Sequence, residues 1–546
     1  MKVSRKMKNV GILTVCLSWS LSLVGCGPSP TVATMESSYD SGATTMVRMN
    51  NASVVAQGAP RAEASAVPMA SAEAEPNTES YQRIVENDFL DTLKNPLSTF
   101  SIDVDTASYS NVRRFLQQQN QLPPADAVRI EELLNYFRYD YPQPTGEHPF
   151  SVSTELADCP WQPDHQLLRV GLQAKKLDFS EAPHSNLVFL LDVSGSMGAP
   201  NKLPLLRQSL RLVVDQLREQ DKVSIVVYAG AAGQVLPATS GEKKDRIMAA
   251  LEELQAGGST AGGEGLRLAY KVAQEQFIPG GNNRIILATD GDFNVGESSD
   301  AAMSRLVEEK RKQGVFLTVL GYGMGNYKDS KMETLANQGN GNYAYIDSLA
   351  EARKVLVNEM GASLVTLAKD VKLQLEFNPA KVASYRLIGY ENRLLAAEDF
   401  DNDAKDAGEL GAGHTVTALY ELVPTGRESA SNTALTYSES QIKDSAFQST
   451  DLMTLKLRYK QPDSEVSQLL SQTVSDQKLD WELASKDLHF AASVAGFGML
   501  LRQSEHRGNA DYQKVLNWGE TGLGADVGGY RAAYLDLVQT ARKLSE

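Results

Sequence analysis

The middle of the chain alternates short, continuously apolar runs with amphipathic segments. Runs of this kind are typical of strands buried on both faces, and the segments between them are typical of helices that cover a sheet. The expected strands are 187–191, 223–228, 284–289, 315–320 and 343–346. The expected helices are 203–217, 245–254, 264–277, 301–313, 331–338 and 350–360. This alternation predicts an α/β domain over 185–365, with a doubly wound, mostly parallel sheet between two layers of helices.

The segments on both sides of this domain have other patterns. The first, 81–184, is predicted as a small α+β N-terminal domain. Its strands are expected at 98–105 and 167–172, and its helices at 110–119 and 129–137. The second, 366–546, is predicted as an α+β C-terminal domain in which strands precede helices. The strands are expected at 371–377, 414–420 and 452–459, and the helices at 488–502, 512–517 and 530–544.

The amino terminus has the pattern of a signal peptide over 1–25. Four basic residues and no acidic one precede an apolar stretch that is too short to cross a membrane comfortably. The stretch ends in Leu23-Val24-Gly25-Cys26, which resembles the bacterial lipobox. The resemblance implies that Cys26 is lipidated and becomes the first residue of the mature protein. An ordinary cleaved signal with an incidental cysteine is the alternative.

The expected lipid anchor places the protein in the cell envelope. Residue 27 is glycine and not aspartate, which by resemblance to lipoprotein sorting implies the outer membrane of a Gram-negative bacterium. Residues 26–80 are rich in Ala, Ser, Thr and Pro and contain few large apolar residues. Such a segment cannot bury enough apolar surface to fold, so we predict a flexible linker with a reach of roughly 40 Å.

Composition narrows the classes of function. The 546 residues carry a formal net charge of −15, which argues against non-specific nucleic-acid binding because that requires a basic surface. The chain has three cysteines, Cys16, Cys26 and Cys159, too few for a disulfide framework. Cys159 is interpreted as a small buried apolar side chain and not as a reactive thiol.

Oxygen-bearing side chains cluster in three loops of the α/β domain. Asp192, Ser194 and Ser196 directly follow the strand 187–191. Thr260 closes a Gly-Gly-Ser-Thr sequence before a predicted helix, and Asp290 follows the strand 284–289. The carboxyl ends of parallel strands meet at one edge of a sheet, so these side chains are expected to converge. Carboxylate and hydroxyl oxygens without thiolate or imidazole predict a site for a hard divalent cation.

Four of these residues also have a purely structural interpretation. Ser194, Ser196 and Thr260 are good helix caps, and Asp290 is suited to a turn. The nearby Asp292 is a competitor for Asp290, although the strand register favours Asp290. The order of all three loops on one βα pattern favours the cation site over four independent structural roles.

The three loops resemble the metal-ion-dependent adhesion site (MIDAS) of the von Willebrand factor type A (VWA) family. The resemblance covers about 185–365 and implies a Rossmann-like sheet. It implies that Ser194, Ser196 and often Thr260 bind the metal directly, and that Asp192 and Asp290 act through waters or hydroxyl groups. Mg²⁺ is the expected ion, with Ca²⁺ and Mn²⁺ left open. A carboxylate from a protein partner would then complete the coordination shell.

The flanking segments resemble a narrower group, the YfbK-type bacterial lipoproteins. The resemblance rests on Asn95–Phe115 and Arg129–Phe137 before the α/β domain, and on Gly413–Glu421 and Asp487–Phe497 after it. It extends the family likeness over most of the mature chain. It implies no reaction, partner identity or oligomeric state.

We therefore predict an envelope-tethered lipoprotein that binds a protein partner with an acidic side chain, and not an enzyme. The serines do not form a Gly-x-Ser-x-Gly elbow, and the six histidines lack metal-ligand spacing. Asp103 and Asp105 are a candidate carboxylate pair, but a strand end or helix cap is the favoured interpretation. The alternatives are a structural envelope protein with a stabilising metal and a metal-assisted hydrolase.

Overall fold

A computed structural model describes residues 78–177, 180, 182–260, 262–291, 300–359, 365–426 and 441–546. The predicted signal peptide, the predicted lipidation site Cys26, most of the predicted linker and Asp292 lie outside these ranges. No helix in the described ranges is both long and apolar enough to cross a membrane. The described residues form one compact unit.

The central segment forms the predicted sheet, with strand order β10-β9-β8-β5-β6-β7. Every neighbouring pair is parallel except β6 and β7, so β7 is an antiparallel edge strand that the sequence pattern did not predict. Several of its residues are exposed, which explains the weak apolar signal. The strands are β5 (Ser185–Asp192), β6 (Lys222–Tyr228), β7 (Ala232–Ser240), β8 (Asn282–Thr289), β9 (Val315–Gly321) and β10 (Tyr343–Tyr345).

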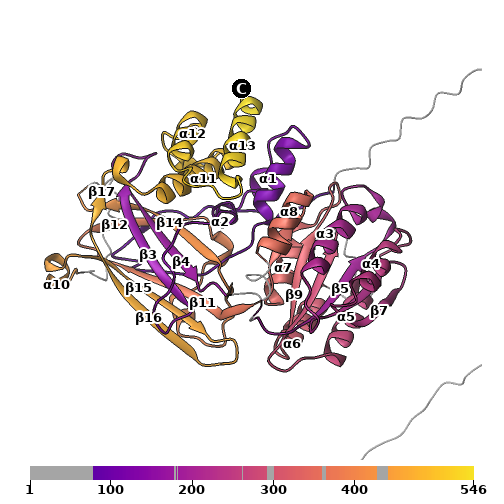
Figure 1. The fold of residues 1–546 in the computed structure, drawn as a ribbon. Coiled ribbons are helices and arrows are strands. Elements are labelled where there is room, and N and C mark those ends of the chain that lie inside the picture. Colours follow the sequence, from indigo (N-terminus) through magenta and orange to yellow (C-terminus); the bar gives the residue numbers. More distant parts are fainter. Residues whose placement is uncertain are drawn as a thin grey trace, which may run out of the picture. The chain divides into compact units, whose positions relative to one another are not determined.

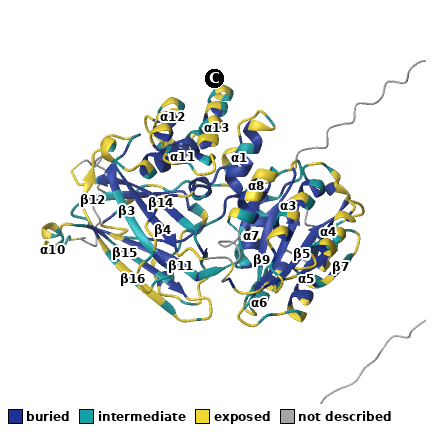
Figure 2. Ribbon diagram, viewed as in Figure 1, coloured by how far each residue is buried: buried dark blue, intermediate teal, exposed yellow. Residues whose placement is uncertain are grey.

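Helices cover both faces of this sheet, as Figure 1 shows. One core lies under α3, α4 and α8 and contains Leu206, Ile247 and Ala352. The other core lies under α5, α6 and α7 and contains Leu266 and Val307. The helices are α3 (Leu203–Gln216), α4 (Lys244–Glu252), α5 (Gly262–Glu275), α6 (Asp300–Arg311), α7 (Asp329–Gln338) and α8 (Leu349–Arg353), which continues into a π-helical turn (Lys354–Asn358). All residues of β5 are buried, as two covered faces require (Figure 2).

The two flanking segments share their sheets, which corrects the prediction of separate N- and C-terminal domains. One sheet has the order β1-β12-β14-β4-β3-β17, and a second has the order β13-β11-β15-β16, with β2 also paired to β11. Strands from before and after the central domain therefore pair with each other in both sheets. Those from before are β1 (Leu90–Asp91), β2 (Leu97–Ser101), β3 (Phe150–Asp158) and β4 (Gln166–Ala174). Those from after are β11 (Thr366–Phe377), β12 (Val382–Ile388), β13 (Gly408–Gly411), β14 (Thr415–Pro424), β15 (Asp451–Lys460), β16 (Ser467–Ser475) and β17 (Lys478–Leu479).

Two apolar cores hold this flanking part together. The first lies between the two sheets and includes Leu168, Leu373 and Tyr420. The second lies between the outer face of the first sheet and a group of helices, and it includes Leu419 and Phe490. The helices of this part are α1 (Ala107–Gln117), α2 (Ile130–Asn135), α10 (Asp444–Gln448), α11 (Lys486–Arg502), α12 (Tyr512–Thr521) and α13 (Tyr530–Ser545). Cys159 is free and buried in the second core, as the sequence predicted.

Buried ion pairs join the flanking part to the central domain. The Arg129 guanidinium, 4% exposed, donates from Nη1 to Asp329 on α7 at 2.5 Å and also pairs with Glu132. Asp105 accepts a hydrogen bond from the Tyr343 backbone N–H at 2.7 Å, and it pairs with Arg393. Burial and the neighbouring Asp103 raise the pKa of Asp105, although Arg393 opposes them. Asp103 and Asp105 thus belong to this network. They follow the end of β2 at Ser101, as the strand-end interpretation predicted, whereas the N-cap position of α1 is Thr106 and not either aspartate.

His414, just before β14, gives a testable pH dependence. Burial of the imidazole, and then the charges of Arg138 and Lys354, lower its pKa to about 3. The unfolded chain takes up a proton near pH 6.5 while the folded chain does not, so stability is present above that pH and falls as the pH drops toward 3. Between pH 7.5 and 5, the free energy of unfolding of wild type should fall by about 1–2 kcal/mol more than that of His414→Gln.

The measurement is denaturant unfolding at both pH values. His184→Gln, at an exposed position, is the matched control and should keep the wild-type pH dependence. Equal acid destabilisation of wild type and His414→Gln would contradict the assignment.

Candidate functional site

Asp192, the last residue of β5, is fixed by hydrogen bonds from three directions. Its Oδ1 accepts from the Ser194 backbone N–H at 2.9 Å. Its Oδ2 accepts from the Tyr228 and Thr289 hydroxyls, each at 3.1 Å. Tyr228 is the residue opposite Asp192 in the β5–β6 register, and Thr289 ends the strand on the other side. The sheet itself therefore orients this carboxylate, which is fully buried.

The two serines of the first loop face each other at the edge of the sheet. The Ser194 and Ser196 Oγ atoms are 3.1 Å apart. Ser194 is buried, whereas Ser196 is exposed, so the pair reaches from the interior to solvent. Ser194 precedes a 3-10 turn (Gly195–Gly198), but its side chain makes no capping hydrogen bond there. The interpretation of Ser194 as a helix cap is therefore wrong.

The second loop is attached to the first through the backbone. The Gly195 N–H donates to the Gly258 carbonyl at 3.0 Å, and the Gly257 N–H donates to the Val193 carbonyl at 2.8 Å. Gly258 has φ +83°, and a Cβ there would lie 3.2 Å from the Gly230 backbone nitrogen. These contacts bring the Gly-Gly-Ser-Thr loop against the serine loop. Thr260, two residues beyond Gly258, is partly exposed in it.

The third loop places Asp290 in direct contact with the first. Its buried carboxylate is hydrogen-bonded by Ser196, by the Lys202 ammonium at 2.9 Å and by the Asn326 side-chain amide at 3.1 Å. The turn needs the following glycine, because Gly291 has φ +90° and a Cβ there would lie 2.5 Å from the Lys328 backbone nitrogen. The structure thus brings together Asp192, Ser194, Ser196 and Asp290 and docks the loop of Thr260 beside them.

The two carboxylates have opposite electrostatic surroundings. Burial raises the pKa of Asp192 to about 6, against the hydrogen bonds that it accepts from Ser194 and Thr289. Burial also acts to raise the pKa of Asp290, but the Lys202 ammonium and the hydrogen bond from Ser196 outweigh it and hold the pKa below its usual value. Asp290 is therefore firmly ionised and already paired with a cation of the chain.

The donor set fits a hard cation. The Ser194 and Ser196 hydroxyls lie in contact, the first beside the Asp192 carboxylate and the second beside that of Asp290. Tyr228 of β6 and Thr289 of β8 hold the Asp192 carboxylate in place. Ser194, Ser196 and Thr260 would be the direct ligands, with Asp192 and Asp290 behind them. When bound, the metal would supply an electrophilic centre for an anionic oxygen.

Sequence reasoning missed four residues that shape the site. Tyr228 and Thr289 could have been found, because each is the last residue of a strand next to β5. Lys202 and Asn326 stand in loops without a local pattern, and only the fold brings them to Asp290.

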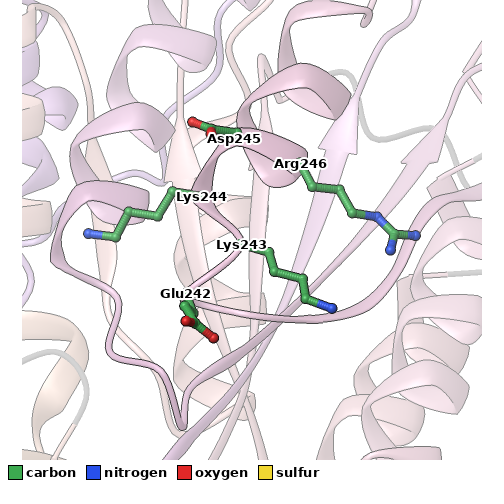
Figure 3. Close-up of a pocket in the computed structure, with 5 residues that line it drawn as sticks. All are labelled: Glu242, Lys243, Lys244, Asp245 and Arg246. Atoms are coloured by element: carbon green, nitrogen blue, oxygen red, sulfur yellow. The ribbon is translucent and has the colours of Figure 1, made fainter.

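A shallow depression lies elsewhere on the central domain. It has a volume of about 350 Å³ and is lined by Glu242, Lys243, Lys244, Asp245 and Arg246 at the start of α4 (Figure 3). The depression follows Ser240, which pairs with Lys222 at the start of β6. The cation site lies at the end of β6, where Tyr228 contacts Asp192. The depression therefore lies toward the opposite edge of the sheet. It is separate from the cation site.

The fold and the three loops define a VWA domain. The family description "von Willebrand factor type A domain" matches residues 186–358, and "von Willebrand factor" matches 75–169. VWA domain proteins mediate protein–protein adhesion, some of them through a MIDAS that binds a divalent metal. The description "Uncharacterized protein YfbK, C-terminal" matches residues 362–544.

The chain belongs to the YfbK family. It is 46% identical over 479 residues to the uncharacterized protein YfbK of Escherichia coli K12, a match that covers 86% of this chain and 82% of that protein. A human inter-alpha-trypsin inhibitor heavy chain H4 is 31% identical over 146 residues, which is 25% of this chain and 16% of that protein. Among solved structures, a von Willebrand factor type A protein from Catenulispora acidiphila has a TM-score of 0.42 at 16% identity, covering 73% of this chain and 92% of that chain.

Proposed function

We propose that this protein is an envelope-tethered adhesion module that captures a protein partner through a divalent cation. The observation that carries the proposal is the connection of Ser194, Ser196 and Asp290 by hydrogen bonds, although they come from two loops nearly 100 residues apart. A third loop is docked on them by two backbone hydrogen bonds. If each residue only capped a helix or closed a turn, the three loops would not have to converge.

The chemistry of the site favours an acidic ligand. In the proposed coordination the direct ligands are neutral hydroxyls, so the metal keeps much of its charge. A carboxylate of the partner would replace a water molecule in the shell. Mg²⁺ is our first choice because it prefers octahedral oxygen coordination and retains water, with Ca²⁺ or Mn²⁺ as alternatives.

The tether in this proposal is the lipid on Cys26. The motif Leu23-Val24-Gly25-Cys26 and the polar linker after it support an anchored, extended attachment, and Gly27 supports the outer membrane. A lipid with several chains anchors a protein stably, whereas one chain is marginal. Incorporation of labelled palmitate that disappears in Cys26→Ala would test the anchor, and persistence of the label would refute it.

The site test is crosslinked capture from membranes in Mg²⁺ and in chelator. We expect Asp192→Ala combined with Ser194→Ala to lose at least about 90% of the capture seen with wild type in Mg²⁺, because one ligand and the carboxylate behind it are removed. Chelator should have the same effect on wild type. The matched control is Lys243→Ala with Asp245→Ala in the depression toward the opposite edge of the sheet, which should capture normally.

Two outcomes would redirect the interpretation. If the double variant captures the same partners as wild type, the adhesion proposal fails. If circular dichroism shows instead that the double variant is unfolded, the result favours the alternative in which the metal stabilises a structural envelope protein.

A further inference from the structure

Lys202 occupies a place in the site that the adhesion chemistry does not require. Its ammonium lies 2.9 Å from the Asp290 Oδ2 and 3.1 Å from the Asn326 Oδ1. The Lys202 side chain is 8% exposed and that of Asp290 is fully buried, so water screens this pair only weakly. An ordinary surface lysine has neither this burial nor this fixed partner.

The fold makes specific room for the lysine. Lys202 precedes α3, ten residues after Asp192, and its aliphatic stem lies against Gly323. A Cβ at residue 323 would lie 2.3 Å from the Lys202 Cε, and Gly323 has φ +76°, a conformation that favours glycine. Two separate loops, 323–326 and the one that begins at Asp290 after β8, therefore hold the ammonium in place.

We propose that Lys202 is an internal counter-cation that tunes the metal site, an inference that rests on the proposed function. Before metal binds, the ammonium neutralises Asp290 and keeps this carboxylate and Ser196 in position. A metal ion must then share Asp290 with a positive charge that is already present. Lys202 thereby weakens the affinity for the metal, so that a bound ion can exchange with ions in solution.

The same charge sets the preference for the ligand. With Lys202 present, a divalent ion and the carboxylates of Asp192 and Asp290 give a site with a net positive charge. Without Lys202 the same loaded site would be neutral. The lysine therefore preserves the attraction of the loaded site for an anionic group such as a carboxylate.

A purely structural role of Lys202 and a role as counter-cation predict opposite changes in metal affinity when the lysine is replaced. A lysine that only stabilised the loops would weaken metal binding when removed, because the ligands would lose their arrangement. A counter-cation predicts tighter metal binding when its charge is removed. The sign of the change in affinity therefore distinguishes the two roles.

The experiment is calorimetric titration of the folded protein with MgCl₂. We expect Lys202→Met and Lys202→Gln to bind Mg²⁺ about tenfold more tightly than wild type, since a nearby positive charge is lost. Lys202→Gln keeps a hydrogen-bond donor for Asp290, so it can still be titrated if Lys202→Met does not fold. Lys202→Arg keeps the charge and should stay within about threefold of wild type. Lys271→Met on α5, where the side chain is 72% exposed, is the control and should leave the affinity unchanged.

The outcomes separate this inference from the proposed function. Equal or weaker Mg²⁺ binding by the folded Lys202→Gln variant, with binding intact in wild type, overturns only the role of Lys202. Absence of Mg²⁺ binding in wild type and in both neutral variants overturns the metal site itself. Binding in the neutral variants alone supports the counter-cation and shows that it excludes the metal under those conditions.

Discussion

Arg129→Met is expected to lower the free energy of unfolding by about 3–5 kcal/mol, the cost of removing one partner from a buried ion pair. The guanidinium is bonded to Glu132 of the flanking part and to Asp329 of the central domain, and both acidic side chains are fully buried. Methionine fills much of the volume but leaves two carboxylates without their cation. These groups must then take up protons or draw in water, and both consequences destabilise the contact between the two parts.

The measurement is denaturant unfolding of the full chain at neutral pH, with Arg211→Met as the matched control. Arg211 pairs with Glu252 at 2.5 Å, but the two side chains are 54% and 63% exposed. An exposed pair contributes less than about 1 kcal/mol, so the control should be nearly neutral. Equal destabilisation by the two substitutions would contradict the importance of burial.

Asp192→Asn is expected to weaken Mg²⁺ binding by about 100-fold or more while the fold persists. Asparagine keeps the oxygen that accepts the Ser194 N–H. Its amide nitrogen would face the Tyr228 and Thr289 hydroxyls, which can rotate and accept as well as donate. The substitution therefore removes the negative charge with little loss of packing.

Calorimetric titration of Asp192→Asn with MgCl₂ checks this prediction. Asp245→Asn, toward the opposite edge of the sheet, changes the net charge by the same amount and should bind like wild type. A tenfold or smaller loss in Asp192→Asn would show that this charge is not part of the metal site.

The central domain could be predicted because its signals are local. Continuously apolar strands, amphipathic helices and the position of polar residues after strand ends all lie within short windows of sequence. The placement of Asp192 and Asp290 at one edge followed from this pattern alone. The edge strand β7 was missed because it is half exposed and antiparallel.

The architecture around the central domain could not be predicted in the same way. Leu373 on β11 pairs with Phe100 on β2, and Thr417 on β14 pairs with Gly171 on β4. No local pattern encodes pairing between strands separated by more than 240 residues. The same limit hid Lys202 and Asn326, whose role depends on loops that only the folded chain brings to Asp290.

One end of the described chain lies close to this site. The Thr78 and Ser80 backbone N–H groups donate to the Gly325 and Tyr327 carbonyls at 2.6 and 3.1 Å. The intervening residue of that loop, Asn326, holds Asp290. In an anchored protein that has captured a partner, tension would therefore run from the lipid through residues 78–80 and one loop to the metal. Glu79, in the same segment, pairs with the Arg114 guanidinium of α1 at 2.7 Å. A pull on this segment would therefore be shared between a loop beside the ion and a helix of the flanking part.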